Sequence, residues 1–225
     1  MSAPGVLSRS VEDYLKAIYR LAEEGGTAAT SDIAQRLDHS PASVTGMVKK
    51  LAESGHLEHV PYRGVRLTDA GRLAALAVMR RHRLLETYLI TKLGYDWSNV
   101  HDEAERLEHA VSDGLIDRMA FALGEPKYDP HGAPIPTREG DIERTHLEPL
   151  AGVEPGVRVA LRQVDDADPE RLRYLKSLGL VPMVELVVAD RQPFGGPITV
   201  RIEGKQPEER VIGAELAASL LVVRR

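Results

Sequence analysis

The chain contains no cysteine, and this absence removes several kinds of chemistry together. Disulfide bonds, thiolate metal sites and a cysteine nucleophile are all excluded. Any metal ion held by this chain must therefore be bound through oxygen and nitrogen. Aromatic residues are also scarce, at 4% of the chain, which leaves little material for a large apolar ligand cavity.

Long hydrophobic runs are missing as well. None reaches the ~20 residues that a membrane span needs, and the first ten residues, MSAPGVLSRS, lack the apolar core of a signal peptide. We therefore expect a cytoplasmic protein without a membrane partner. The 225 residues, 43% hydrophobic and 28% charged, are typical of one large globular domain or two to three small ones.

The net charge of −5 gives no overall basic character, but its distribution leaves room for a DNA-binding face. Residues 1–74 hold nine Lys/Arg and nine Asp/Glu, whereas residues 75–145 hold nine against thirteen. The acidic excess therefore lies mostly in the middle of the chain, and the N-terminal third is balanced.

Residues 1–74 have the pattern of a winged helix-turn-helix domain. Apolar residues recur on one helical face after Ser10, and Glu24, Gly25 and Gly26 are expected to end that helix. After a second helix, a third begins with Ser40 as its N-cap and Pro41 in its first turn. Two strand-like runs at 57–60 and 65–68, joined by a Pro/Gly turn, then predict the hairpin of the wing.

Residues 75–145 are predicted to be a helical domain, and residues 146–225 a small β domain. Thr68 is expected to cap a long helix, Ser98 opens a second helix that reaches Val111, and Ser112 caps a third. Residues 124–140 contain four prolines and are typical of a linker. Strand-like runs near 156–164, 181–189 and 197–203, with one short helix near 169–178, predict a small β-barrel. The fold class is thus mainly α with small β parts.

The start of the third helix is the predicted DNA-reading element, because this end enters the major groove in such domains. Its small residues allow close approach, while basic side chains there and in the wing can meet phosphates. A lysine pair alone is more typical of a solvated helix face, but the hairpin and helix start favour DNA. His39, His56 and His59 are expected to be surface groups. The candidate contacts are Ser40, Pro41, Ala42, Ser43, Thr45, Gly46, Lys49, Lys50 and Arg63.

Histidine and glutamate recur at helical spacing in the middle of the chain. His101, Glu105, Glu108 and His109 would fall within an arc of about 100° on one helix, and His82 and Glu86 are one turn apart. A single Glu–His pair is more often a surface contact than a pair of ligands. Two matching stripes instead indicate a carboxylate–imidazole metal site, which suits manganese, iron(II), cobalt or zinc.

Five segments together resemble the diphtheria-toxin-repressor family of metal-activated repressors: VEDYLKAIYRL, SPASVTGMVKKL, MRRHRLLETYL, VHDEAERLEHAVSD and DPHGAPIP. The resemblance implies a homodimer with two metal sites per chain. It implies that residues 75–145 form the dimerisation and metal-binding domain and that residues 146–225 form an SH3-like domain. It implies a primary site formed by Asp13, Glu105, Glu108 and His109. It implies an ancillary site formed by His82, Glu86 and His101, with Asp165, Asp166, Asp168 and Glu170 as candidates to complete it, Asp168 and Glu170 being the tentative choices. His131 is interpreted as structural.

Two positions bear on the choice of metal. Iron-type members of the family hold Met and Cys where this chain has Asp13 and Glu105, so the resemblance favours Mn²⁺, with Fe²⁺ as the alternative. Co²⁺, Zn²⁺ or Cd²⁺ could substitute in vitro. In the manganese branch a glutamate usually stands where this chain has Lys16, which sets the chain apart from that branch's paired-metal arrangement.

The predicted function is a metal-dependent repressor of metal-homeostasis genes that binds a palindromic double-stranded operator and is not an enzyme. Activation at some promoters is a variant of this prediction. One alternative is a winged-helix regulator of an organic effector, which requires an apolar cavity. Another is a carboxylate-bridged metalloenzyme, which requires an open coordination position and a substrate pocket. No nucleophile motif or phosphate-binding glycine loop supports a small-molecule substrate.

Overall fold

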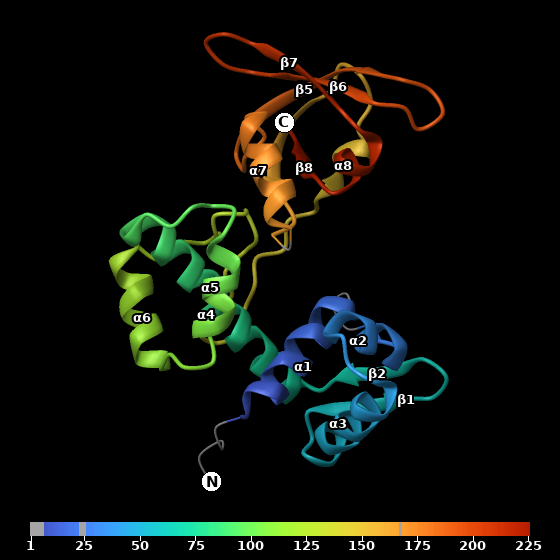
Figure 1. The fold of residues 1–225 in the computed structure, drawn as a ribbon, viewed down its shortest axis with the longest axis vertical. Helices are drawn as coiled ribbons and strands as arrows, with labels where there is room; N and C mark the ends of the chain where they lie inside the picture. Colours follow the sequence, from blue (N-terminus) through green and yellow to red (C-terminus); the bar gives the residue numbers. More distant parts are fainter. Residues whose placement is uncertain (1–6, 23–25, 167) are drawn as a thin grey trace. The chain divides into compact units, whose positions relative to one another are not determined.

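The computed structural model describes residues 7–22, 26–166 and 168–225. The chain divides into two compact units. Figure 1 shows its helices and strands, coloured along the sequence. The first unit comprises Met1–His82, Glu108–Val111 and Pro136–Ile142. The second comprises Arg83–Leu107, Ser112–Ile135 and Glu143–Arg225. No helix among the described residues is long and apolar enough to span a membrane.

The first unit contains the predicted winged helix-turn-helix. Its elements are α1 (Arg9–Leu21), α2 (Thr30–Leu37), α3 (Pro41–Glu53), β1 (Leu57–Val60), β2 (Gly64–Leu67) and the start of α4 (Asp69–Leu93). The helical apolar spacing buries Leu15, Ile18 and Ile33 in one core with Val44 and Leu51. Of the predicted stop for the first helix, Glu24 and Gly25 lie outside the described residues, and α1 ends at Leu21.

Local side-chain hydrogen bonds cap the helices of this unit, and a glycine allows the turn of the wing. The Ser40 hydroxyl accepts a hydrogen bond from the Ser43 N–H and caps α3 as predicted. The Thr68 hydroxyl accepts from the Gly71 N–H at the start of α4. Gly64 closes the wing with φ +98°, and a Cβ there would lie 2.2 Å from the Ala28 carbonyl oxygen, so only glycine fits.

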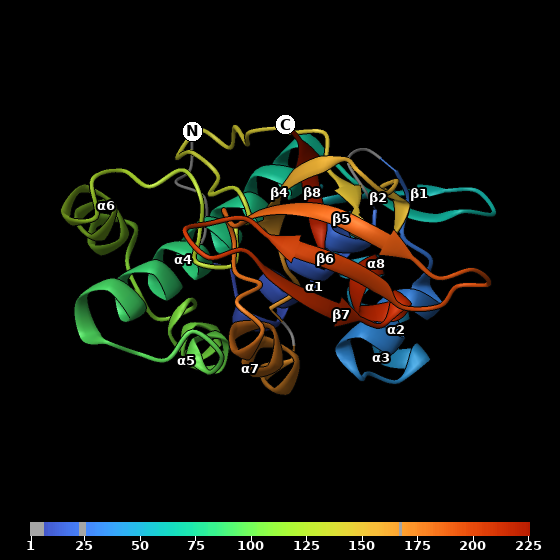
Figure 2. The ribbon, with the colours of Figure 1, turned by 90° about the horizontal axis from the view of Figure 1, so that it is seen from above.

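The second unit joins a helical part to a β domain. Its remaining elements are α5 (Val100–Leu107), α6 (Asp113–Ala122), β3 (Glu148–Pro149), a 3₁₀ turn (Leu150–Gly152), β4 (Arg158–Gln163), α7 (Pro169–Ser177), β5 (Glu185–Arg191), β6 (Ile198–Ile202), β7 (Glu208–Ile212), α8 (Ala214–Ala218) and β8 (Leu221–Arg224). The antiparallel sheet has the order β3-β8-β4-β5-β6-β7, and Figure 2 shows β5, β6 and β7 side by side. Its buried face forms a separate core.

Two predictions for the helices were wrong. The helix expected to carry His101 to Val111 ends at Leu107, and residues 108–110 form a turn. The Glu108 carboxylate is bound by side chains of the first unit, and this tertiary contact outweighs helical continuation. Ser98 does not open the helix either, because its hydroxyl donates to the Asp96 carboxylate in a turn before Val100.

The β domain has more strands than predicted. Three strands were predicted there, and β4, β5 and β6 correspond to them, whereas β3, β7 and β8 were missed. Strand β7, EERVI, pairs along the edge of the sheet with a charged face, so hydrophobic alternation gives little signal for it. The short helix α7 lies where it was predicted.

Candidate metal centre and nucleic-acid interface

Three of the four residues predicted for the primary metal site meet in the first unit. Asp13 lies on α1, and Glu108 and His109 lie in the turn after α5, with one potential ligand atom of each within 4.8 Å of the others. The His109 Nε2 atom is 2.9 Å from Asp13 Oδ1 and 3.3 Å from Glu108 Oε1. One imidazole nitrogen therefore faces two carboxylate oxygens.

Glu12 determines which nitrogen of His109 faces those oxygens. Its Oε2 is 2.6 Å from His109 Nδ1, and its Oε1 is 2.5 Å from Arg81 Nη2. A carboxylate at Nδ1 holds the proton there, which leaves the Nε2 lone pair directed at Asp13 and Glu108. An imidazole nitrogen between two carboxylate oxygens needs a positive charge there, which either a proton on Nε2 or a bound metal ion supplies. Sequence reasoning missed Glu12, whose only signal was its place beside Asp13.

Glu108 is fully buried and is held by two basic side chains of the same unit. Lys16 Nζ donates to Oε1 at 2.9 Å and to Oε2 at 3.0 Å, and His82 Nδ1 is 2.6 Å from Oε2. Burial acts to raise the pKa of Glu108, but the His82 hydrogen bond and the Lys16 charge outweigh it, so the pKa is lowered. His82, predicted for the ancillary site, thus contacts a residue of the primary group.

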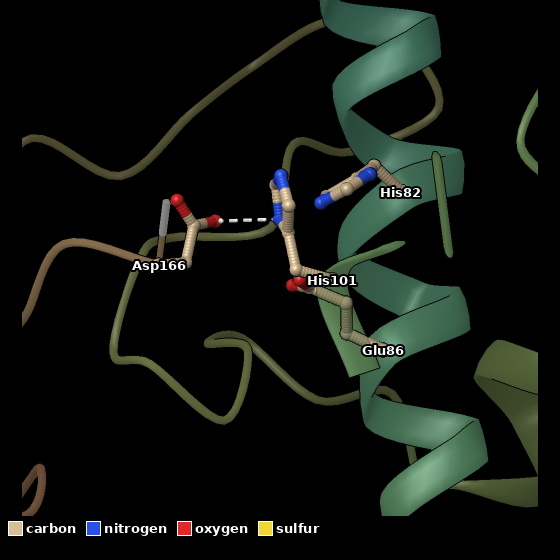
Figure 3. A group of neighbouring side chains, drawn as sticks. All are labelled: His82, Glu86, His101 and Asp166. Atoms are coloured by element: carbon tan, nitrogen blue, oxygen red, sulfur yellow. Dashed lines mark hydrogen bonds and ion pairs between the residues drawn. The ribbon is translucent and has the colours of Figure 1, made fainter. Parts of the chain in front are cut away.

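Glu86, His101 and Asp166 gather in the second unit (Figure 3). His101 Nδ1 is 3.3 Å from Glu86 Oε1 and 3.5 Å from Asp166 Oδ2, and Glu105 Oε1 is 3.8 Å from His101 Nε2. Burial acts to lower the pKa of His101, but hydrogen bonds to Asp166 and Glu86 raise it to about 10. Both contacts therefore favour the imidazolium form of His101. Figure 3 also shows His82, one turn before Glu86 on α4.

The segment predicted to be a linker brings two further residues to this group. His131 is buried, with Nδ1 3.7 Å from Glu86 Oε2, Nε2 3.0 Å from the Trp97 carbonyl oxygen, and its ring stacked on Trp97. Asp129 Oδ1 accepts hydrogen bonds from the His131 and Ala133 N–H groups. Among the described residues, His131 Nδ1 and Asp129 Oδ2 are buried without a hydrogen bond.

Burial and the nearby Glu86 charge raise the pKa of Asp129 to about 6, although the charge of Arg83, 3.5 Å from its Oδ2, acts in the opposite direction. Two buried acids, Glu86 and Asp129, therefore lie close to the imidazoles of His101 and His131. Gly132 fixes the loop on β4, because it has φ +88° and a Cβ there would lie 1.7 Å from the Arg162 carbonyl oxygen.

The acids tentatively assigned from the C-terminal domain lie elsewhere. Asp168 caps α7, where its Oδ1 accepts from the Glu170 and Arg171 N–H groups. Glu170 is exposed beside Arg173. Among the candidate acids, Asp166 is the one that contacts His101.

The predicted DNA-contacting residues are all exposed and lie at the N-cap of α3, along α3 and in the wing. The Ser40 and Ser43 hydroxyls lie 2.9 Å apart, and the Thr45 hydroxyl donates to the Pro41 carbonyl. These bonds stabilise the helix start. Lys49, Lys50 and Arg63 are all exposed.

A hollow of about 300 Å³ lies between α1 and α3. The Tyr14 hydroxyl is 2.9 Å from His39 Nδ1 at its wall, so a buried residue of α1 positions the turn before α3. At the wing tip, Tyr62 is completely exposed with φ +63°. Sequence reasoning did not single out Tyr14 or Tyr62. The hollow is lined by Ser10, Tyr14, His39, Ser43, Gly46, Met47 and Lys50.

Comparison with known proteins relates this arrangement to one class of regulator. Residues 6–65 match the family model of an iron dependent repressor, N-terminal DNA binding domain. Residues 68–137 match an iron dependent repressor, metal binding and dimerisation domain, and residues 148–224 match a FeoA domain.

Individual relatives agree with these matches along most of the chain. The iron-dependent repressor IdeR of Mycobacterium tuberculosis is 35% identical over 210 residues, which cover 88% of this chain and 90% of that protein. The diphtheria toxin repressor of Corynebacterium diphtheriae is 40% identical over 209 residues, covering 88% and 91%. A solved structure of a manganese-dependent transcriptional repressor complex with manganese superimposes with a TM-score of 0.87 at 41% identity, covering 96% and 100%.

The chain belongs to the diphtheria-toxin-repressor family of metal-dependent, DNA-binding transcriptional repressors. This confirms the predicted function and the SH3-like fold of the C-terminal domain. The family consists of DNA-binding repressors and not of enzymes, and its middle domain binds metal and dimerises.

Proposed function

We propose that this protein represses metal-homeostasis genes when Mn²⁺ binds, and that it recognises a palindromic operator as a homodimer. The observation that carries the proposal is the orientation of His109. Its Nδ1 is held by Glu12, while its Nε2 faces the Asp13 and Glu108 oxygens. Such a convergence of acceptors is suited to a divalent cation.

The proposed primary site consists of Asp13, Glu108 and His109, with Glu105 as the fourth ligand. The first three gather in one unit, and Glu105 is assigned by its place three residues before Glu108 and by family resemblance. Carboxylates at the Asp13 and Glu105 positions favour Mn²⁺, because hard oxygen ligands suit Mn²⁺ better than they suit soft metal ions. Fe²⁺ is the second candidate for the same ligands.

The proposed ancillary site consists of Glu86, His101 and Asp166, together with His131 and Asp129. The contacts of His101 support the first three. The contact of His131 Nδ1 with Glu86 Oε2 at 3.7 Å supports His131. Asp129 is included because its Oδ1 holds the His131 backbone N–H and its Oδ2 pairs with Arg83. His82, one turn before Glu86 on α4, stays a proposed ligand of this site, as the family resemblance implies, while its Nδ1 is 2.6 Å from Glu108 Oε2.

The switch is proposed to act through α1. A bound divalent cation supplies the positive charge that the facing carboxylates of the primary site lack. Asp13 then anchors the start of α1 to Glu108 and His109, and Tyr14, the next residue, holds His39 just before α3. Metal binding thereby fixes α3 relative to the proposed metal ligands of the same unit. By linkage, DNA binding then increases the affinity for metal, and metal binding increases the affinity for DNA.

For DNA we propose that α3 and the wing carry out recognition. The small residues from Ser40 to Gly46 allow close approach to base edges, while Lys49, Lys50 and Arg63 meet phosphates. In a dimer, two such helices would read half-sites about 34 Å apart, which requires a palindrome.

A gel-shift titration with Mn²⁺, Fe²⁺, Co²⁺, Zn²⁺ and Cd²⁺ tests the proposal, with a palindromic site selected from random DNA. We expect Mn²⁺ to promote binding at the lowest free concentration among the metals available in cells, and chelator to reverse it. Equal binding in chelator and in Mn²⁺ would contradict the proposal.

A further inference from the structure

Lys16 is buried beside the proposed primary metal site, which is an unusual place for a lysine. The residue is only 5% exposed, although lysine side chains generally extend their ammonium group to water. Its Nζ atom lies 2.9 and 3.0 Å from the two oxygens of Glu108. A buried ammonium is tolerated only when a carboxylate compensates its charge, so Lys16 and Glu108 form a mutually dependent pair.

The same carboxylate belongs to the acceptor group that faces His109. Glu108 Oε1 is 3.3 Å from His109 Nε2 and 2.9 Å from Lys16 Nζ. A divalent cation bound by Glu108 and His109 would therefore share its carboxylate with a fixed ammonium. Two cations on one buried carboxylate repel strongly, because the local dielectric constant is low.

Lys16 follows Asp13 by one turn of α1, so both side chains point to the same face of the helix. One helix thus offers a ligand for the cation and a positive charge that opposes it. This placement does not require the metal ligands to move, since Asp13, Glu108 and His109 are already gathered while Lys16 is in place.

We propose that Lys16 is a built-in competing cation: it neutralises Glu108 in the metal-free protein and weakens metal binding at the primary site, so that it sets the metal concentration needed for repression. The inference rests on the proposed function, because it takes Glu108 to be a metal ligand. A purely structural role for Lys16 makes the opposite prediction, since loss of a residue that merely positions Glu108 would weaken metal binding.

The test is isothermal titration with Mn²⁺ of the full chain carrying Lys16→Met, which removes the charge and keeps the length of the side chain. Asp166→Asn is included in every protein to weaken the ancillary group. We expect at least 10-fold tighter Mn²⁺ binding and a lower melting temperature without metal. Lys92→Met, on the exposed surface of α4, is the matched control and should change neither. Unchanged or weaker Mn²⁺ binding would overturn the inference.

Two further variants keep the test decisive if Lys16→Met folds poorly. Lys16→Gln also removes the charge but can still donate a hydrogen bond to Glu108, and it should tighten Mn²⁺ binding in the same direction. Adding Glu108→Gln to Lys16→Met should recover the stability without metal, because neither charge of the Lys16–Glu108 pair is then left buried alone. Failure to recover it would contradict the pairing.

Retained primary-site binding by Glu108→Gln alone would instead contradict the proposed function. If that variant loses Mn²⁺ while Lys16→Met binds no tighter, only the inference on Lys16 fails.

Discussion

At the scale of single residues, the primary group depends on partners as much as on ligands. Asp13, Glu108 and His109 could be predicted because each had a position in a helical pattern or in a family motif. Glu12 and Lys16 could not, since their roles come from contacts across 97 and 92 positions of the chain. Burial of those contacts is decided by tertiary packing, which residue spacing does not encode.

Glu12→Gln tests the orientation of His109. The amide can present its NH₂ group to Nδ1 and favours the tautomer that protonates Nε2, so the lone pair no longer faces Asp13. We expect Mn²⁺ affinity to fall 10- to 100-fold, the range typical of lost partners of metal-binding histidines. Calorimetric titration measures it, and Glu53→Gln, at the exposed end of α3, serves as the control. Wild-type affinity in Glu12→Gln would refute the assigned role.

At the scale of elements, the caps of three helices and the apolar faces were predictable, whereas the start and the end of α5 were not. The caps at Ser40, Thr68 and Ser112 were found from the sequence because they are local. The end of α5 at Leu107 was not, because Glu108 leaves the helix for a tertiary ion pair. The helical stripe predicted from His101 to His109 is therefore divided. His101 and Glu105 lie on α5, whereas Glu108 and His109 lie in the turn that follows it.

The loop that carries Asp129 and His131 is an element of the proposed ancillary site. Gly132→Ala should destabilise it by about 1–3 kcal/mol, since alanine is strained at positive φ and its Cβ would collide with β4. Urea denaturation measures the change. Gly114→Ala in α6 is the matched control, because its Cβ would meet no atom within 4 Å, and its effect should be neutral or slightly stabilising. Equal effects of the two substitutions would contradict the tight seating of the loop.

The turn before α5 should make a pH-dependent contribution. Hydrogen bonds from the Ser98 hydroxyl and N–H, with the nearby Lys176 ammonium, hold the pKa of Asp96 below its ordinary value of 3.8. A lowered pKa stabilises the fold above pH 3.8, and this contribution is lost as the pH falls through the lowered pKa. Asp96→Asn should therefore cost at most about 1 kcal/mol at pH 7, because the pair is half exposed.

Chemical denaturation of Asp96→Asn and wild type at pH 7 and pH 3 measures that effect. The difference between the two proteins should be smaller at pH 3. Asp102→Asn, an exposed acid of α5, should show no such trend. A difference that grows on acidification would show that the sign is wrong.

At the scale of the whole molecule, the family relationship and the site geometry lead to one account in which metal binding and DNA binding are linked. Composition and motifs were sufficient to predict the winged helix, the metal-binding domain and the SH3-like domain, and the family comparisons confirm their nature. The proposed link depends on Asp13, because this residue of α1 lies 2.9 Å from His109 in the proposed primary site.

The most direct test is fluorescence anisotropy of operator DNA with Asp13→Ala, with and without Mn²⁺, beside size measurement of the same protein. The account predicts that Mn²⁺ no longer promotes operator binding, while the dimer and the weak, salt-sensitive binding to unrelated DNA persist. Metal-independent operator binding by Asp13→Ala at wild-type strength, or an unchanged response to Mn²⁺, would contradict it.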